Sequence, residues 1–291
     1  MITTKAILVN PSISSWSGQR QDRKVSEEIE DAKGAKHGSG VYRKYLIDPN
    51  APALKKIRDI DSQMRAYHYG ITLPWGDDGA RLLASVAYME YMEKMGSYRN
   101  LRETAVRDFI SQYPAHKEIA KQRLNGLYNE DDYPTPETLE EKFSVRIKVN
   151  PVPDGNDLRV DIGADEKAKI RAQIEEETNR AISDAVMHVL GRMKKCVDDM
   201  MGRLSSYSVN DKGKPEHTFR DSVVGNMREL LDIIPKLNVT NDPRITEMAQ
   251  RIGDSLLGNS PAELRDNYFV RSETISKADE LSKALESMGV Q

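Results

Sequence analysis

The side chains best suited to chemistry lie in one glycine-rich segment, residues 68–83. It holds three glycines, paired aspartates and one of the two tryptophans of the chain. Glycine loses more backbone freedom on folding than any other residue, so this composition favours a segment with a defined conformation over a simple connector. Asp77 and Asp78 could contribute to a site for a divalent cation. Asp61 or the acidic residues 130–132 could complete that site, since magnesium needs only one or two carboxylates beside substrate phosphates.

A structural role for the two aspartates is the favoured interpretation. A carboxylate at Asp77 or Asp78 would cap a helix that begins near Ala80, where it accepts hydrogen bonds from free amides and meets the positive end of the helix dipole. Trp75 and Leu73 would then form a buried plug beneath the loop. The alternative for Trp75 is a binding anchor that stacks on a base or on a side chain of a partner.

Further candidate residues follow the first predicted strand. Trp16 lies there with Arg20, Arg23 and Lys24, a combination that could bind a phosphate group. The more ordinary interpretation is a capped strand end followed by a solvated helix. The candidates for binding a protein partner or nucleic acid are therefore Trp75, Asp77, Asp78, Arg81, Trp16 and Arg20.

The sequence lacks the usual patterns of catalytic and cofactor sites. It contains neither the Gly-x-Ser-x-Gly elbow of serine hydrolases nor the glycine-rich loop ending in Lys and Ser or Thr that binds phosphates. With one cysteine, Cys196, and no paired histidines at metal spacing, a zinc site is not expected. We expect no catalytic residue, no metal and no cofactor, and the balance of these observations is against an enzyme.

Composition and charge limit the class of protein. Of 291 residues, 43 are basic and 46 are acidic, so a net charge of −3 provides no global field for nucleic-acid binding. A basic face can still lie within a balanced total. The single cysteine fits a reducing compartment, and no apolar run approaches the ~18 residues of a membrane span. Residues 1–5 lack the start of a secretory signal, so we expect a soluble cytoplasmic protein with no membrane partner.

The periodicity of apolar residues predicts an α+β protein that is mostly helical. Residues 5–14 are expected to form an edge strand or a bulged strand, because Pro11 cannot donate a backbone hydrogen bond. Residues 83–113 have apolar side chains every three or four positions, which predicts a long amphipathic helix that ends before Pro114. Further helices are expected at 19–33, 52–69, 116–127 and from 135 onward.

Two segments alternate apolar and polar residues as half-buried strands do. They are residues 143–149 and 158–162, and the intervening residues 151–157 contain two prolines. We expect a β-hairpin whose loop is wider than a tight turn. This hairpin would contribute to a small antiparallel sheet.

Residues 165–205 are expected to form the dominant helix, about 60 Å long if unbroken. Its apolar residues alternate at spacings of four and three, which is typical of a coiled-coil seam: Val186, Leu190, Met193, Val197, Met200 and Leu204. We expect the other long helix, residues 83–113, to pack against it in the antiparallel direction. A homo-oligomeric partner is the alternative.

The polar segment 207–216 is the best candidate for a domain boundary, because it contains a glycine and a proline. It would divide the chain into an α+β domain with a long helical hairpin, residues 1–206, and a small C-terminal helical region, residues 217–291. Helix starts are expected in that region at Asp242-Pro243 and at the capping box Ser260-Pro261-Ala262-Glu263.

Four segments of the sequence form a recognisable pattern in a fixed order. They are residues 8–14 with Trp16 and Arg20, residues 73–83 with Tyr91-Met92, residues 127–134, and residues 151–153 with 159–161. In this order they resemble a family of phage and prophage proteins that is recorded only as a domain of unknown function. The resemblance covers about residues 5–205 and supplies no catalytic residue. It implies a phage protein in the cytoplasm of a bacterial host, encoded near ring ATPases of the MoxR type, and hence an accessory or adaptor role.

These observations predict a non-enzymatic interaction or adaptor protein that acts in a cytoplasmic assembly. The expected partner is a protein, and the resemblance implies an AAA+ ATPase of the MoxR type. The alternative is a protein that binds or anneals single-stranded nucleic acid in phage recombination. Four aromatic residues lie near basic residues in the sequence: Tyr67, Tyr69, Trp75 and Tyr88. A homo-oligomer is compatible with either function.

Overall fold

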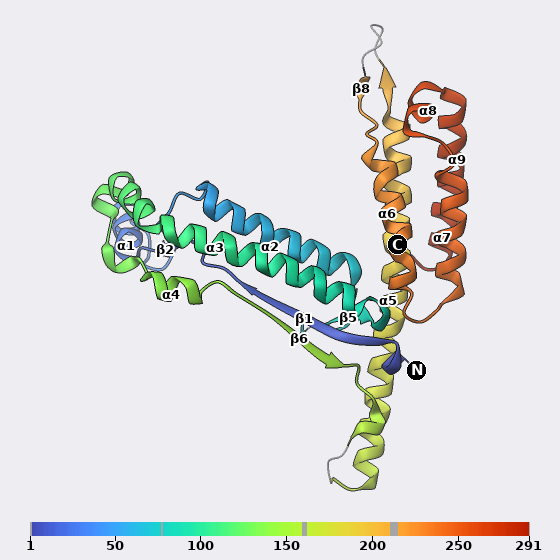
Figure 1. Ribbon diagram of the computed structural model, residues 1–291, viewed down its shortest axis with the longest axis horizontal. Coiled ribbons are helices and arrows are strands. Elements are labelled where there is room, and N and C mark those ends of the chain that lie inside the picture. Colours follow the sequence, from blue (N-terminus) through green and yellow to red (C-terminus); the bar gives the residue numbers. More distant parts are fainter. Residues whose placement is uncertain (1, 77, 159–161, 210–214, 291) are drawn as a thin grey trace. The chain divides into compact units, whose positions relative to one another are not determined.

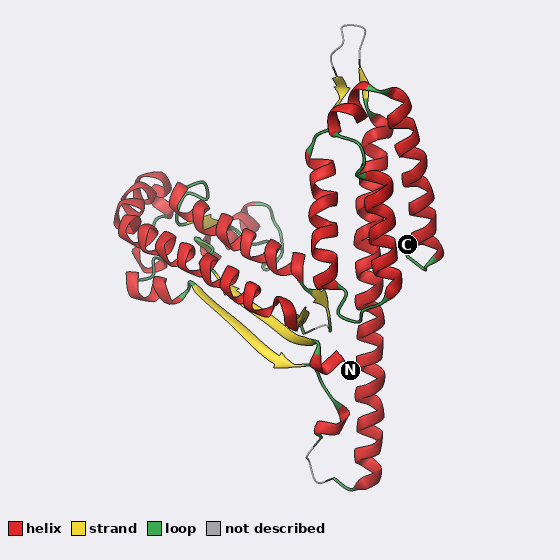
Figure 2. Ribbon diagram, turned by 45° about the vertical axis from the view of Figure 1, so that its right-hand side comes forward, coloured by secondary structure: helices red, strands yellow, loops and turns green. Residues whose placement is uncertain are grey.

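The computed structural model describes residues 2–76, 78–158, 162–209 and 215–290. It is 68% helical and contains a small antiparallel sheet, which confirms the predicted α+β, mostly helical fold class (Figure 1, Figure 2). The helices are α1 (Arg23–Ala32), α2 (Pro52–Ile71), α3 (Tyr88–Leu124), α4 (Pro136–Glu141), α5 (Ala164–Ser206), α6 (Ser222–Leu237), α7 (Pro243–Leu256), α8 (Pro261–Asp266) and α9 (Tyr268–Ser287). Among the described residues, no helix has both the length and the apolar composition that a membrane span requires.

The chain divides into two compact units, and each unit is built from segments that are separate in sequence. Unit 1 contains Met1–Asn10, Tyr69–Met89 and Val149–Gln291, and unit 2 contains Pro11–His68 and Glu90–Lys148. The predicted boundary at residues 207–216 falls inside unit 1.

The strands form one sheet of four and two short pairs. They are β1 (Ala6–Ser14), β2 (Gln19–Gln21), β3 (Arg43–Tyr45), β4 (Leu73–Pro74), β5 (Arg81–Ala84), β6 (Ser144–Pro151), β7 (Ser208–Val209) and β8 (Pro215–His217). The larger sheet has the order β4-β5-β1-β6, while β2 pairs with β3 and β7 with β8. The predicted strand 143–149 is therefore confirmed as β6, and its neighbour is β1. The hairpin partner predicted at 158–162 includes residues 159–161, which lie outside the described residues.

Strand β1 lies inside the sheet, which corrects the first of the two predicted alternatives, an edge strand. Its antiparallel pairing with β5 runs from Ala6 opposite Ala84 to Val9 opposite Arg81. Pro11 lies beyond the last of these pairs, so its missing N–H group removes no hydrogen bond to β5. A proline at this position is therefore compatible with an internal strand.

The segment after the glycine-rich loop forms a strand where a helix was predicted. Residues 81–84 are β5, and α3 begins only at Tyr88. Leu82 and Leu83 are both at most 1% exposed, although they are consecutive. Consecutive side chains of a strand point to opposite faces, so both are buried when both faces of the sheet are covered. The apolar spacing that begins at residue 83 in the sequence corresponds to an α-helix only from Tyr88 onward.

Helix α3 continues through Pro114 to Leu124, so the two helices predicted on either side of this proline are one. A proline inside a helix removes one hydrogen bond and costs about 3 kcal/mol. Packing around the preceding turn compensates for that cost. Tyr113 is 1% exposed, contacts Trp16 edge-on with ring centroids 5.9 Å apart, and donates a hydrogen bond of 3.1 Å to the Pro134 carbonyl.

In unit 1, α5 packs against α9, α6 and α7 to form a helical bundle (Figure 1). The seam residues predicted in this helix are all at most 8% exposed, so the prediction that the seam is buried is confirmed. The structure corrects the predicted partner, because α9, α6 and α7 contact α5 where residues 83–113 were expected to do so. Helix α7 is suited to this packing, since its buried residues recur at helical spacing: Ile245, Met248, Ile252 and Leu256.

Both helix starts predicted in the C-terminal region are confirmed. The Asp242 carboxylate accepts a hydrogen bond of 2.9 Å from the backbone N–H of Arg244 at the start of α7. Helix α8 begins with a reciprocal capping box, in which the Ser260 and Glu263 side chains each accept from the other residue's backbone N–H. These local signals act within three residues and do not depend on the tertiary fold.

Candidate functional site

The glycine-rich segment places Trp75 beside α5. The indole is half-buried and lines a cleft of about 530 Å³ in unit 1. The apolar side chains of this cleft come from Trp75, Pro153, Ile174 and Ala181, and its charged ones are Glu177, Arg180 and Asp184. Leu73, by contrast, is 1% exposed. The plug predicted beneath the loop is therefore Leu73, whereas part of Trp75 faces solvent.

Asp78 stabilises a turn and not the start of a helix. Its carboxylate accepts a hydrogen bond of 2.9 Å from the backbone N–H of Ala80, and its backbone carbonyl accepts one of 3.3 Å from the Asn10 amide. Gly79 has a φ of +81°, a conformation that favours glycine. Because β5 follows directly, the predicted helix cap is wrong. Asp77 lies outside the described residues.

Arg81 has a structural role at the C-terminal end of α2. Its guanidinium donates to the Thr72 hydroxyl over 2.7 Å and to the Thr72 carbonyl over 2.9 Å, and it lies 4.8 Å from the centroid of the Tyr69 ring. Arg192 of α5 donates to the Gly70 carbonyl over 2.7 Å. Basic side chains thus satisfy carbonyls that a helix end leaves free. Burial lowers the pKa of Arg81, although the guanidinium remains charged.

His188 lies near these two arginines and is held neutral. Burial, together with the charges of Arg81 and Arg192, lowers the pKa of His188 from its usual value of 6.5. Within the described chain, its Nδ1 atom is buried without a hydrogen-bond partner. The unpaired nitrogen and the lowered pKa both disfavour the protonated ring at neutral pH.

In unit 2, Trp16 is a core residue and not a binding anchor. It is 9% exposed and packs against Phe109 and Tyr113, with ring centroids 6.1 Å and 5.9 Å away. Arg20 is exposed, and its Nε atom lies 3.5 Å from the Asp132 carboxylate. Trp16 is therefore not available to stack on a ligand, and a carboxylate accompanies the exposed cation.

Three of the carboxylates suggested for a cation site are paired with basic side chains. Asp61 lies 2.6 Å from Arg102, Asp132 lies 2.8 Å from Lys44, and Glu130 pairs with Lys117. The described residues contain no group of three or more His, Cys, Asp or Glu side chains placed to hold a metal ion. The three paired acids, Asp61, Asp132 and Glu130, therefore contribute to the fold of unit 2.

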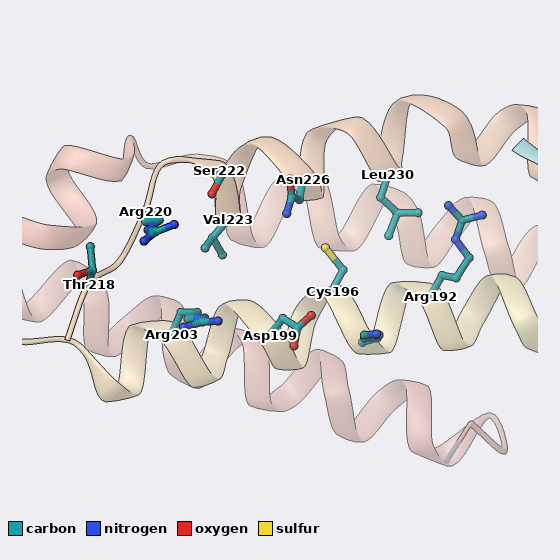
Figure 3. Close-up of a pocket in the computed structure, with 11 residues that line it drawn as sticks. Arg192, Cys196, Asp199, Arg203, Thr218, Arg220, Ser222, Val223, Asn226 and Leu230 are labelled. Carbon is teal, nitrogen blue, oxygen red and sulfur yellow. The ribbon is translucent and has the colours of Figure 1, made fainter. Parts of the chain in front are cut away.

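A basic groove between α5 and α6 was not found by sequence reasoning. It has a volume of about 890 Å³ and lies entirely in unit 1 (Figure 3). Its charged lining consists of Arg192, Lys195, Arg203 and Arg220, with one carboxylate, Asp199. Figure 3 shows Ser222, Val223, Asn226 and Leu230 of α6 opposite Cys196 and Asp199 of α5. We call this site the basic groove.

The spacing of the charged residues of α5 was a sequence signal for the basic groove. Positions 192, 195, 199 and 203 follow one another at intervals of three and four, which places them on one face of a helix. The apolar seam on the opposite side of the same helix gave the stronger pattern. Only the position of α6 shows that the polar face forms one wall of a groove.

The basic groove is suited to binding anions and not to nucleophilic catalysis. Burial, and then the neighbouring Asp199 charge, raise the pKa of Cys196, so its thiol stays protonated. Hydroxyl and amide groups at Thr218, Ser222 and Asn226 add neutral hydrogen-bonding partners to the four cations. Such a combination is typical of a surface that holds phosphate or carboxylate groups.

No family model, curated protein or solved structure matches this chain. The resemblance to a phage protein family therefore stays a prediction from the sequence.

Proposed function

We propose that this chain is a non-enzymatic adaptor protein that binds a protein partner through the Trp75 cleft. The observation that carries the proposal is a half-buried tryptophan beside apolar Pro153, Ile174 and Ala181 at an accessible site. Tryptophan is enriched among the few residues that supply most of the binding energy in protein interfaces. A partly exposed indole over an apolar floor is the arrangement that such an anchor needs.

The charges around the cleft favour a protein over a polyanion. Glu177 and Asp184 contribute negative charge, and Arg180 contributes positive charge. A rim of mixed sign surrounding an apolar centre is typical of protein–protein interfaces. A nucleic acid would meet two carboxylates here and one guanidinium, so the balance is repulsive.

The identity of the partner follows from the resemblance alone. A phage protein encoded near ring ATPases of the MoxR type would act in the bacterial cytoplasm, with such an ATPase as its partner. The adaptor function assigns no reaction to this chain.

The proposal is tested by comparing the full chain with its Trp75→Ala variant. The tagged full chain is purified from the bacterium that produces it, co-purifying proteins are identified by mass spectrometry, and their affinities are measured by interferometry. We expect a MoxR-type ATPase to bind, and Trp75→Ala to weaken that binding by roughly 30-fold or more, the effect of losing an interface anchor.

The matched control is Met89→Ala, which removes another exposed apolar side chain of unit 1 outside the cleft. It should bind the partner as the unmodified chain does. Equal binding by Trp75→Ala and the unmodified chain would show that the cleft is not the docking site. Recovery of the chain with no specific protein would overturn the adaptor function.

A further inference from the structure

The basic groove concentrates unpaired positive charge in a chain whose net charge is −3. Among the residues described, Lys195, Arg203 and Arg220 have no ion-pair partner, although Asp199 lines the same groove. Lys44, by contrast, is paired with the carboxylates of Asp22 and Asp132. Four basic side chains beside one carboxylate, Asp199, create a local positive potential that attracts an anion.

The basic residues of the groove extend over a length that suits a chain of anions more than a single anion. Arg192 and Arg203 are eleven residues apart on α5, which corresponds to about 16 Å along the helix. Successive charges of one nucleic-acid strand are separated by about 3.4 Å along a duplex. The basic groove can therefore contact several consecutive phosphates, while Ser222 and Asn226 offer hydrogen bonds to them.

An aromatic cluster continues from the Arg203 end of the basic groove. Tyr207 follows Arg203 by one helical turn, and the Arg271 guanidinium lies 5.1 Å from the Tyr207 ring centroid and 5.6 Å from that of Tyr268. Tyr268 contacts Phe269 edge-on, with ring centroids 5.9 Å apart. Tyr268 is 67% exposed and Phe269 is 82% exposed, so neither ring contributes its full area to the core.

We propose that the basic groove and this aromatic cluster together bind single-stranded nucleic acid. The cations contact the phosphates, and Tyr268 and Phe269 stack on bases at the Arg203 end. A positive groove that follows the backbone, combined with accessible aromatic side chains, is the arrangement by which proteins hold single strands without sequence preference. The inference goes beyond the adaptor function, because it uses a different set of residues from the Trp75 cleft.

Two other polyanions fit these observations less well. An acidic protein segment would satisfy the cations but gives no role to the exposed aromatic pair, Tyr268 and Phe269. A duplex offers phosphates, but its base faces are stacked on one another and are not available to these rings. Both are included in the experiment as competing ligands.

The experiment measures fluorescence anisotropy of the full chain with a labelled oligothymidine of about 30 nucleotides, a length that exceeds common single-strand site sizes. We expect the logarithm of the association constant to fall with the logarithm of salt concentration with a slope of about −2, from roughly 0.7 for each of the three unpaired cations. The double variant that carries both Arg203→Gln and Arg220→Gln should have a slope that is shallower by about 1.4.

The aromatic cluster is tested separately by Phe269→Ala. This variant should bind about tenfold more weakly with the same salt slope, because stacking is lost while the cations remain. Phe269→Trp should retain the affinity. The matched control for charge is the double variant that carries both Lys277→Gln and Lys283→Gln. It removes two exposed cations of the same unit outside the groove, and it should leave binding unchanged.

Several outcomes would overturn the inference. They are the absence of binding at low salt, equal affinity for single strand and duplex with no effect of Phe269→Ala, or groove-dependent binding of a polyglutamate peptide without binding of the oligonucleotide. The Trp75→Ala variant separates the two proposals. It should bind the oligonucleotide normally even if it has lost its protein partner.

Discussion

A buried ion pair in unit 2 shows how individual residues stabilise this fold. The side chains of Arg102 and Asp61 are only 3% and 4% exposed, and the Arg102 Nε atom lies 2.6 Å from the Asp61 carboxylate. Arg102 also donates to the Ser15 hydroxyl over 2.8 Å, while that hydroxyl donates to Asp61. Two charges removed from water in this way depend on each other, since either one alone would be buried without compensation.

Replacing one partner of this pair should therefore destabilise the protein strongly. Arg102→Met leaves Asp61 as an unpaired buried charge, and we expect it to lower the free energy of unfolding by about 3–5 kcal/mol. The double variant Asp61→Leu with Arg102→Met should recover most of that loss, because no uncompensated charge remains. Urea unfolding followed by circular dichroism measures both values. Losses that are simply additive would show that the two charges are not coupled.

At the scale of single elements, Pro114 in α3 gives a direct test of how packing overrides local preference. Its side chain is exposed, so Pro114→Ala removes little packing and restores a helical hydrogen bond. We expect the variant to be about 1–2 kcal/mol more stable, since the helical gain of about 3 kcal/mol exceeds the entropy that proline removes from the unfolded chain. The midpoint of urea unfolding reports this change.

Pro136 provides the matched control for that measurement. It lies at the first turn of α4, after the capping residue Thr135, where proline is favourable. Pro136→Ala should be neutral or slightly destabilising. If Pro114→Ala also destabilises the protein, the proline would be contributing to α3 through contacts of its own.

The elements that could be predicted from sequence are those whose signals are local. The cap at Asp242, the capping box at Ser260 and the seam of α5 were all predicted and are all present. The failures depend on distant segments. Residues 81–84 form a strand because β1 and β4 lie on either side of them, and α5 is covered by helices that follow it in the chain.

The same distinction applies to the candidate sites. Trp16 and Trp75 looked equivalent in the sequence, yet Phe109 and Tyr113 bury the first while the second lines an open cleft. No pattern around either tryptophan reports this difference, because the aromatic partners of Trp16 are more than ninety residues away. The basic groove depends on the position of α6 in the same way.

At the scale of the whole molecule, the C-terminal helices are integral to unit 1. Ending the chain after residue 260 removes α8 and α9, and α9 packs against α5. We expect this truncation to expose the α5 seam, to increase binding of a hydrophobic dye and to cause aggregation. Dye fluorescence and size-exclusion chromatography measure these effects. A truncated chain that stays monomeric and cooperatively folded would instead show that α5 does not need α9 to cover its seam.

The division of the chain between the two units has a consequence for how the protein is made and dismantled. The backbone passes from one unit to the other four times, after Asn10, His68, Met89 and Lys148. No single protease cut can release either unit intact. On the ribosome, every segment of unit 2 has been synthesised once Lys148 has been added. In unit 1, residues 6–9 cannot pair until β5 has been synthesised, and the α5 seam stays uncovered until α9 has been synthesised. Translation therefore presents unit 2 complete before unit 1, although unit 1 includes residues that precede all of unit 2 in the chain.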